Sequence, residues 1–225
     1  MTGRTSDSGS ATRRPRLFGR VYPILDAAVF GTEDPVPVLS GLAAAGVEMV
    51  QLRAKGLAAG PFLAWVRAAM RGAAAVGLRV IVNDRADVAL LAGAAGAHLG
   101  QDDLSPARAR EFLGKDAILG ASTHNPRQVQ EAAASPVDYL AIGPVFATTT
   151  KADAEPAVGL EGVRAARAGY RGPLVAIGGI SAARIPEVLA AGAVAVAVIG
   201  ALGREVSQVP ERAARLLRRA DPGAR

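Results

Sequence analysis

The chain has 225 residues, half of them apolar, which is enough for one large domain or two small ones. Its net charge of +6 comes from the two ends: residues 1–20 carry five Arg and one Asp, and residues 211–225 carry five Arg against Glu211 and Asp221. Because the body between them is nearly neutral and the basic ends lack interleaved aromatic residues, composition argues against a nucleic-acid partner.

The two ends and the most apolar stretch set the expected boundaries. Residues 1–19 are rich in Ser, Thr, Gly and Arg and are predicted to form a disordered basic tail, and residues 206–225 a last helix with a basic C-terminal tail. The stretch from Val188 to Gly203 is too short for a membrane span and contains three glycines, so we expect a buried helix end followed by a buried strand and no membrane partner. The chain has no cysteine, which excludes thiol catalysis and is compatible with the cytoplasmic location that we expect.

From residue 21 onward, short apolar runs of β character alternate with longer Ala-rich helical segments. Strands are expected at 21–25, 49–53, 79–84, 96–100, 117–123, 139–145, 173–179 and 195–201. Helix starts are expected where an N-cap residue precedes proline, and a further one at a serine after the seventh strand; these are Asp34-Pro35, Ser105-Pro106, Asn125-Pro126 and Ser181. Buried strands separated by helices require parallel pairing, so eight such units in residues 20–205 predict an α/β fold of the TIM (β/α)8 barrel type. A doubly wound open sheet is the structural alternative.

Polar residues gather at the expected carboxyl ends of these strands, where barrels of this kind place their active sites. Fixed positive charge comes from Arg53, Lys55 and Lys151, and neutral hydrogen-bond donors from Ser122, Thr148, Thr149 and Thr150. The pair Gly178-Gly179 leaves backbone amides open to close approach at an expected helix start. These groups are suited to binding phosphate.

Two carboxylates on neighbouring strand ends, Asp84 and Asp103, are candidate ligands for a hard cation. The absence of clustered His or Cys favours Mg²⁺, which typically takes one or two carboxylates together with substrate phosphates. A metal and three cationic side chains indicate a diphosphate rather than a single phosphate. No serine has an apparent base and there is no cysteine, so we expect no catalytic nucleophile.

Each of these features also has a purely structural interpretation. Arg53 and Lys55 could pair with Asp84 or Glu48, and Asp102 and Asp103 could simply begin a helix. The two histidines also have structural interpretations. His98 lies in an expected buried strand, where a histidine is usually part of the core, and His124 lies at a strand end, where it could stabilise the turn. Thr149 could point away from a site that Thr148 and Thr150 face, because neighbours in an extended segment point to opposite sides.

The long connection after Val145 is typical of an active-site lid.

The motifs "QLRAK", "VNDR", "HLGQDD", "GASTH", "GPVFATTTK" and "AIGGI" occur in this order over residues 20–205, and with them the chain resembles the thiamine phosphate synthase (thiamine-phosphate pyrophosphorylase) family. That family is a TIM barrel that joins hydroxymethylpyrimidine diphosphate to a thiazole phosphate with Mg²⁺ and releases diphosphate. The resemblance implies a dissociative reaction in which the pyrimidine methylene loses diphosphate. Its partners would be small phosphorylated molecules, with no nucleic acid or membrane; the sequence does not give the oligomeric state.

The resemblance also implies roles for individual residues. The pyrimidine diphosphate would be held by Gln51, Leu52, Arg53, Ala54, Lys55, Asn83, Ser122 and Lys151, of which Arg53, Lys55, Ser122 and Lys151 would be catalytic. The thiazole phosphate would be held by Thr148, Thr149, Thr150, Gly178, Gly179, Val198, Ile199 and Gly200, and Mg²⁺ by Asp84 and Asp103. The family often has Glu where this chain has Ala54, and commonly has serine where it has Gly200. Two other functions stay open: a thiazole tautomerase, for which His124 would be the residue of interest, and a non-catalytic barrel that binds a phosphorylated metabolite.

Overall fold

The computed structural model describes residues 17, 19–148, 150, 155–221 and 223. Its strands are β1 (Val21–Asp26), β2 (Met49–Arg53), β3 (Arg79–Asn83), β4 (Gly96–Leu99), β5 (Ile118–Thr123), β6 (Tyr139–Ile142), β7 (Leu174–Ile177) and β8 (Ala195–Val198). Its α-helices are α1 (Ala27–Phe30), α2 (Val36–Ala44), α3 (Ala59–Val76), α4 (Ala86–Ala92), α5 (Pro106–Leu113), α6 (Pro126–Ala133), α7 (Gly159–Gly169), α8 (Ile185–Ala190) and α9 (Val209–Ala220). Two short 3-10 helices, Gly200–Leu202 and Val206–Gln208, lie between β8 and α9.

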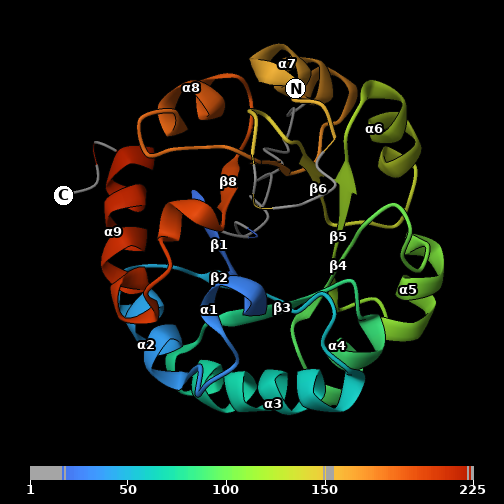
Figure 1. Cartoon of the computed structure of the whole chain (residues 1–225). Helices are drawn as coiled ribbons and strands as arrows, with labels where there is room; N and C mark the ends of the chain where they lie inside the picture. Colours follow the sequence, from blue (N-terminus) through green and yellow to red (C-terminus); the bar gives the residue numbers. More distant parts are fainter. Residues whose placement is uncertain (1–16, 18, 149, 151–154, 222, 224–225) are drawn as a thin grey trace, which may run out of the picture.

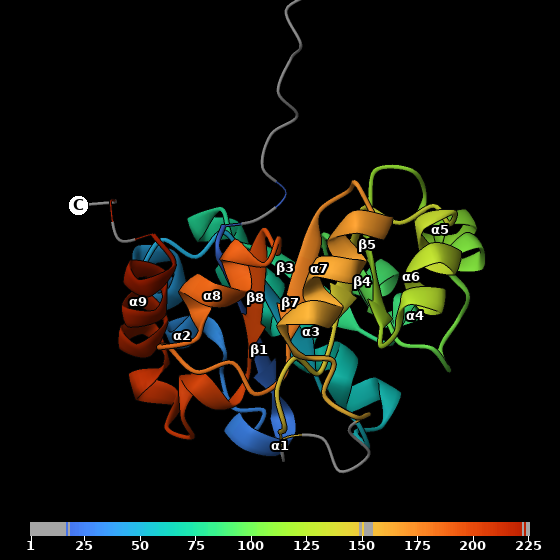
Figure 2. The ribbon, with the colours of Figure 1, turned by 90° about the horizontal axis from the view of Figure 1, so that it is seen from above.

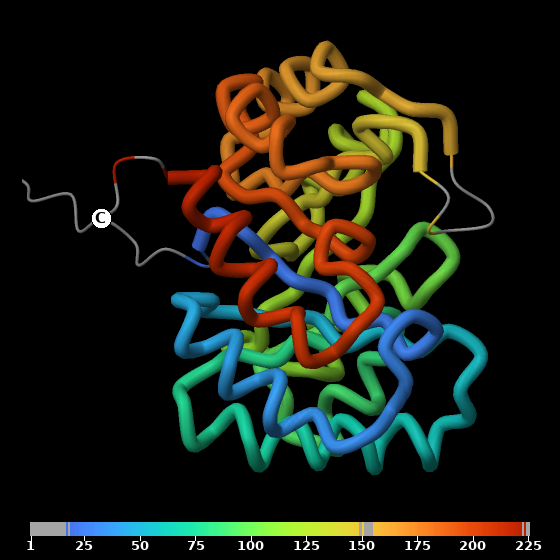
Figure 3. Tube along the Cα trace, turned by 60° about the vertical axis from the view of Figure 1, so that its left-hand side comes forward, coloured from blue at the N-terminus to red at the C-terminus, as the bar shows by residue number. Residues whose placement is uncertain are grey.

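The strands form one closed barrel in sequence order, and every neighbouring pair is parallel, β8 with β1 included. Figure 1 shows helices α2 to α9 as a ring around these strands, and Figure 2 shows the strands from another side, inside the ring. The predicted TIM barrel is therefore confirmed, and the open sheet is excluded. The last helix, α9, packs against β1 and α2 and so completes the ring, as Figure 3 shows for α9 in red and α2 in blue.

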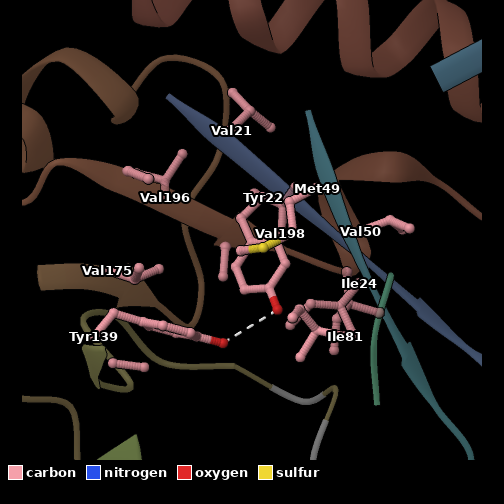
Figure 4. Close-up of a cluster of buried hydrophobic side chains, with 14 of the residues drawn as sticks. Val21, Tyr22, Ile24, Met49, Val50, Ile81, Tyr139, Val175, Val196 and Val198 are labelled. Atoms are coloured by element: carbon pink, nitrogen blue, oxygen red, sulfur yellow. Dashed lines mark hydrogen bonds between the residues drawn. The ribbon is translucent and has the colours of Figure 1, made fainter. Parts of the chain in front are cut away.

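Side chains alternate strictly between the inside of the barrel and the helix layer. Residues that face inward from one level include Tyr22 of β1 and Tyr139 of β6, whose rings meet edge to face at 6.1 Å between centroids (Figure 4). The residues between the inward-facing positions of a strand, such as Val50 and Leu52 of β2, face the helix layer and are fully buried. Burial on both faces explains why most of the strands were recognisable as short apolar runs, with polar residues mainly toward their carboxyl ends. Among the described residues, no helix is both long and apolar enough to cross a membrane.

Some local expectations were wrong in detail. Helix α8 begins at Ile185 after Arg184, because Ser181 lies in a preceding turn in which its carbonyl accepts from the Arg184 amide; Ser181 is therefore not the cap. Asn125 does cap α6, since its side chain accepts from the Gln128 amide, whereas Ser105 precedes α5 without a side-chain capping bond. Strands β6 and β7 end earlier than predicted, so the glycine pair lies in a loop before α8 and not at its first turn.

Candidate active site

A large pocket opens at the carboxyl ends of the strands, with a volume of about 920 Å³. Its walls come from the ends of β2 to β8 and from the connection between β6 and α7. Most of the residues predicted from strand ends line it, namely Arg53, Lys55, Asn83, Asp84, Asp103, Ser122, Thr148, Thr150, Gly178, Gly179, Val198, Ile199 and Gly200. Side chains that are far apart in the sequence therefore share one cavity because parallel strands of a barrel end on the same rim.

The guanidinium of Arg53 is held in place by a carboxylate that sequence reasoning missed. Asp26 stands directly opposite Arg53 in the register of β1 on β2, and its Oδ2 accepts a hydrogen bond from Arg53. The residues are 2 % and 8 % exposed, so this is a buried ion pair rather than the pairing with Asp84 or Glu48 considered from the sequence. The second oxygen, Oδ1, accepts from the Ala28 amide at 3.0 Å and caps α1. Asp26 thus fixes the orientation of a cation on the pocket wall.

The two predicted metal ligands lie next to each other on one side of the pocket. Asp84 follows β3 in a left-handed conformation with φ of 62°, which directs its carboxylate into the pocket, and the Lys55 ammonium lies 3.8 Å from its Oδ2. Burial and the neighbouring carboxyl of Asp103 raise the pKa of Asp84 to about 6. Asp103 also accepts a hydrogen bond from the Gly100 amide at 2.6 Å. The raised pKa of Asp84 beside a second carboxyl group indicates that this position favours binding of a proton or a cation.

Ser122 of β5 has a hydrogen-bond partner that the sequence did not reveal. Its Oγ lies 2.9 Å from Nε2 of His98, a residue of β4 that is buried beneath the pocket. The expectation that no serine has an apparent base is therefore wrong, because the strand register brings together two residues separated by 24 positions. His98 is a buried strand histidine as expected, but it is bonded to a residue that lines the pocket.

The connection between β6 and α7 is anchored to β7. The Val145 amide donates to the Ile177 carbonyl at 2.8 Å and the Phe146 amide donates to the Gly178 carbonyl at 3.0 Å, which extends the strand pairing beyond the ends of both strands. Gly178 has φ of 99°, and a Cβ there would lie 2.4 Å from the Cβ of Pro144. This glycine therefore allows the connection to pack against the barrel rim. The guanidinium of Arg184 lies 3.9 Å from the centroid of the Phe146 ring and holds the connection from the other side.

Two of the three threonines of this connection are placed. Thr148 and Thr150 both line the pocket, their hydroxyl oxygens are 3.3 Å apart, and the Thr150 amide donates to Thr148 Oγ1 at 3.3 Å. Thr149 and Lys151, also predicted as ligands of the substrates, lie outside the described residues.

The pocket is also lined by residues that were not predicted as ligands, among them a histidine and a glutamate. His124 donates from Nδ1 to the Gly143 carbonyl at 2.5 Å, so it joins the end of β5 to the start of the connection rather than stabilising only its own turn. Glu155 adds a carboxylate to the pocket wall and carries no motif that distinguishes it from other acidic loop residues.

With this geometry in place, comparison with known proteins decides the family. The model of the family described as "Thiamine monophosphate synthase" matches residues 21–202. The chain belongs to this family. The thiamine-phosphate synthase of Koribacter versatilis is 46 % identical over 187 residues, which cover 81 % of this chain and 88 % of that protein. The thiamine-phosphate synthase of Xanthobacter autotrophicus is 42 % identical over 205 residues, which cover 91 % and 96 % of the two chains. The solved thiamine phosphate pyrophosphorylase of Pyrococcus furiosus superposes with a TM-score of 0.79 at 29 % identity, covering 90 % of this chain and 96 % of that one.

Three residues of the "QLRAK" motif of this thiamine monophosphate synthase family member do not line the large pocket. Gln51 faces inward one level deeper, where it lines a small cavity of about 20 Å³ together with Arg53 and Ser122. Leu52 faces the helix layer, and Ala54 is buried at the rim. The inward pair Gln51 and Arg53 and the outward Leu52 follow the alternation expected of a strand.

The departure at Gly200 leaves open space in the pocket wall of this family member. A Cβ at this position would have Thr150 Oγ1 as its nearest neighbour, at 3.6 Å, which is ordinary van der Waals contact. The position therefore has room for the serine that the family commonly carries, beside a threonine hydroxyl.

Proposed function

We propose that this protein forms thiamine phosphate from 4-amino-2-methyl-5-hydroxymethylpyrimidine diphosphate and a thiazole phosphate and releases diphosphate. The observation that carries the proposal is the division of the pocket. Among the described residues, the cationic side chains and most of the carboxylates stand at the ends of β2 to β4, whereas threonine hydroxyls, glycine backbone and the carboxylate of Glu155 stand at β6 to β8. This division suits two phosphorylated substrates of different charge, and about 920 Å³ is a volume typical of small-molecule sites.

On the charged side, we assign the diphosphate to Arg53 and Lys55, with Lys151 joining them from the connection. Arg53 is pre-oriented by Asp26, so little side-chain entropy is lost when its planar group binds phosphate oxygens. Ser122 and Asn83, which line both the large pocket and the small cavity beneath it, and Gln51 in that small cavity are assigned to the pyrimidine.

We assign Mg²⁺ to Asp84 and Asp103. Among the described residues no group of three or more His, Cys, Asp and Glu side chains could hold a metal, so the two carboxylates would need substrate oxygens or water to complete the coordination. This requirement fits Mg²⁺, which usually combines one or two carboxylates with substrate phosphates. When bound, the ion would neutralise part of the diphosphate charge and so stabilise it as a leaving group.

In the proposed reaction, the bond between the pyrimidine methylene carbon and the diphosphate oxygen breaks, and both electrons leave with the diphosphate. The thiazole nitrogen then donates its electron pair to the methylene carbon and forms the new C–N bond. The side chains contribute charge rather than covalent chemistry, because Arg53, Lys55 and Lys151 stabilise the negative charge that develops on the departing group. Ser122 has His98 as a possible base, but this course needs no covalent intermediate.

On the side of β6 to β8, we assign the thiazole phosphate to Thr148, Thr150 and the backbone around Gly178 and Gly200. Hydroxyl and amide groups can bind a monophosphate without adding positive charge beside the thiazole, whose nitrogen becomes cationic in the product. Glu155, which also lines the pocket, adds negative charge to the same connection.

The test is to mix the purified protein with pyrimidine diphosphate, thiazole phosphate and Mg²⁺, and to follow thiamine phosphate by mass spectrometry and diphosphate by a coupled assay. We expect both products in equal amounts, and neither when the thiazole phosphate or Mg²⁺ is omitted. Rearrangement of thiazole phosphate alone, without metal, would support a tautomerase instead. Tight binding of the substrates without any product would support a non-catalytic barrel.

A further inference from the structure

A chain of buried polar side chains runs from the pocket into the barrel. Ser122 Oγ lies 2.9 Å from His98 Nε2, and His98 Nδ1 lies 2.9 Å from the Tyr139 hydroxyl. That hydroxyl lies 3.2 Å from the hydroxyl of Tyr22, which accepts a hydrogen bond from Gln51 Nε2 at 3.1 Å. The chain therefore links one pocket residue to four side chains from other strands, and we call it the Ser122 relay.

A missing side chain makes the relay possible. Gly120 of β5 is the register partner of His98 on one side and of Tyr139 on the other. A Cβ at Gly120 would lie 2.1 Å from Tyr139 Cζ and 2.5 Å from His98 Nδ1, so any other residue would push these rings apart. In its absence the rings stack with centroids 5.4 Å apart and an interplanar angle of 26°. The glycine thus brings an imidazole and a phenol into contact across the strand that carries Ser122.

The two tyrosines form a rigid, neutral end of the relay. Both tyrosine side chains are fully buried. Figure 4 shows their hydroxyl groups pointing toward each other inside a shell of Val and Ile side chains. Burial raises the pKa of both phenols, so each stays a neutral hydroxyl that can donate or accept. Stacking on the Tyr139 ring and the contact with its hydroxyl hold the imidazole in one orientation beside Ser122.

We propose that His98 and Tyr139 are positioning residues that fix the Ser122 hydroxyl toward the bound pyrimidine diphosphate. The proposal rests on the function proposed above for the same site. A serine hydroxyl otherwise chooses among three staggered rotamers, and only one of them keeps the 2.9 Å contact with His98. Holding a ligand-binding group in the productive geometry is worth one to two orders of magnitude in rate for a displacement of about 1 Å.

The relay also determines the hydrogen-bonding role of Ser122. With the proton on Nδ1, His98 donates to Tyr139 and Nε2 accepts from Ser122, whose oxygen then faces the pocket as an acceptor. With the proton on Nε2, His98 donates to Ser122, and the serine proton is available to the ligand. A ligand that presents an acceptor, such as a phosphate oxygen or ring nitrogen, selects the second tautomer.

The test combines single and double variants with product formation at saturating Mg²⁺. Ser122→Ala is expected to lower kcat about a hundredfold, and His98→Asn, whose amide reaches only the Nδ1 position, at least about tenfold. The double variant is expected to be no slower than Ser122→Ala, because His98 acts through Ser122. His98→Gln, whose amide reaches the Nε2 position, is expected to recover most of the activity lost in His98→Asn.

Two controls separate positioning from loss of folding. Tyr139→Phe, which keeps the ring and removes the hydroxyl, is expected to lower kcat several-fold, whereas Tyr170→Phe, which alters a buried tyrosine of the helix layer, is expected to leave it unchanged. Unfolding temperatures, measured alongside, would identify any variant that is merely unstable. Losses that multiply in the double variant, or equal activity of the Asn and Gln variants, would overturn the proposal.

Failure of the proposed function gives a different result. If the unsubstituted protein made no thiamine phosphate, calorimetry would still measure the affinity for the pyrimidine diphosphate. The proteins compared would be the unsubstituted protein, Ser122→Ala, His98→Asn and their double variant. Non-additive losses of affinity would then support the relay without turnover. Independent losses in the binding cycle would overturn the relay even if the unsubstituted protein were active.

Discussion

Asp26→Asn tests whether the buried ion pair with Arg53 organises the charged side of the pocket. Asn keeps an oxygen that can accept from the Ala28 amide and cap α1, but it loses the charge that pairs with Arg53 and places an amide NH2 group, a donor, where an oxygen now accepts from Arg53. Because Asp26 and Arg53 are 2 % and 8 % exposed, the guanidinium would be left largely desolvated without a counter-charge. Breaking such a buried pair typically costs about 3–5 kcal/mol.

For a chain of this length, each kcal/mol corresponds to about 2–4 °C in the unfolding temperature, so we expect Asp26→Asn to lower it by about 6–20 °C. Differential scanning calorimetry at pH 7 without ligand measures this shift. The matched control is Glu161→Gln, which removes the partner of Arg164 in an exposed pair and is expected to cost about 0–1 kcal/mol.

The activity of Asp26→Asn provides a second measurement. With its partner removed, Arg53 is no longer held toward the pocket wall, so we expect a higher KM for the pyrimidine diphosphate than in Glu161→Gln. The reasoning is refuted if Asp26→Asn unfolds within about 2 °C of Glu161→Gln, because a shift of less than about 1 kcal/mol would show that the pair contributes no more than an exposed one.

Three further predictions concern the metal and the two substrate sides. Since the pKa of Asp84 is raised to about 6, Mg²⁺ must displace a proton from this carboxyl group below that pH. Calorimetry in the presence of pyrimidine diphosphate should therefore show Mg²⁺ binding about tenfold more weakly at pH 5 than at pH 7.5. An unchanged Kd for Mg²⁺ would contradict the assignment. Gly200→Ser has room beside Thr150 and should lower the KM for thiazole phosphate several-fold through one added hydrogen bond, whereas Gly200→Ala should not. Lys151→Ala should lower kcat by about two to three orders of magnitude with both substrates and Mg²⁺ saturating; near-normal kcat would exclude Lys151 from the diphosphate site.

The sequence by itself determined the barrel and the rim on which the site lies. Apolar runs buried on both faces, separated by helical segments, are a local property of the chain, and parallel pairing follows from them. Once the strands are placed, the residues at their carboxyl ends must share one rim, so Ser122 and Asp84 were recognisable as residues of one site without any structure. The alternation of Gln51, Leu52 and Arg53 also follows from strand geometry alone.

Only the tertiary structure decided which side chains touch one another inside that rim. The pairing of Asp26 with Arg53 depends on the register of β1 on β2, and a shift of one residue would point the two side chains to opposite faces. The contact of His98 with Tyr139 depends on two registers at once and on the absence of a side chain at Gly120. Register is set by the closure of the whole barrel, whose strand tilt and stagger are linked, and no local stretch of sequence carries that information.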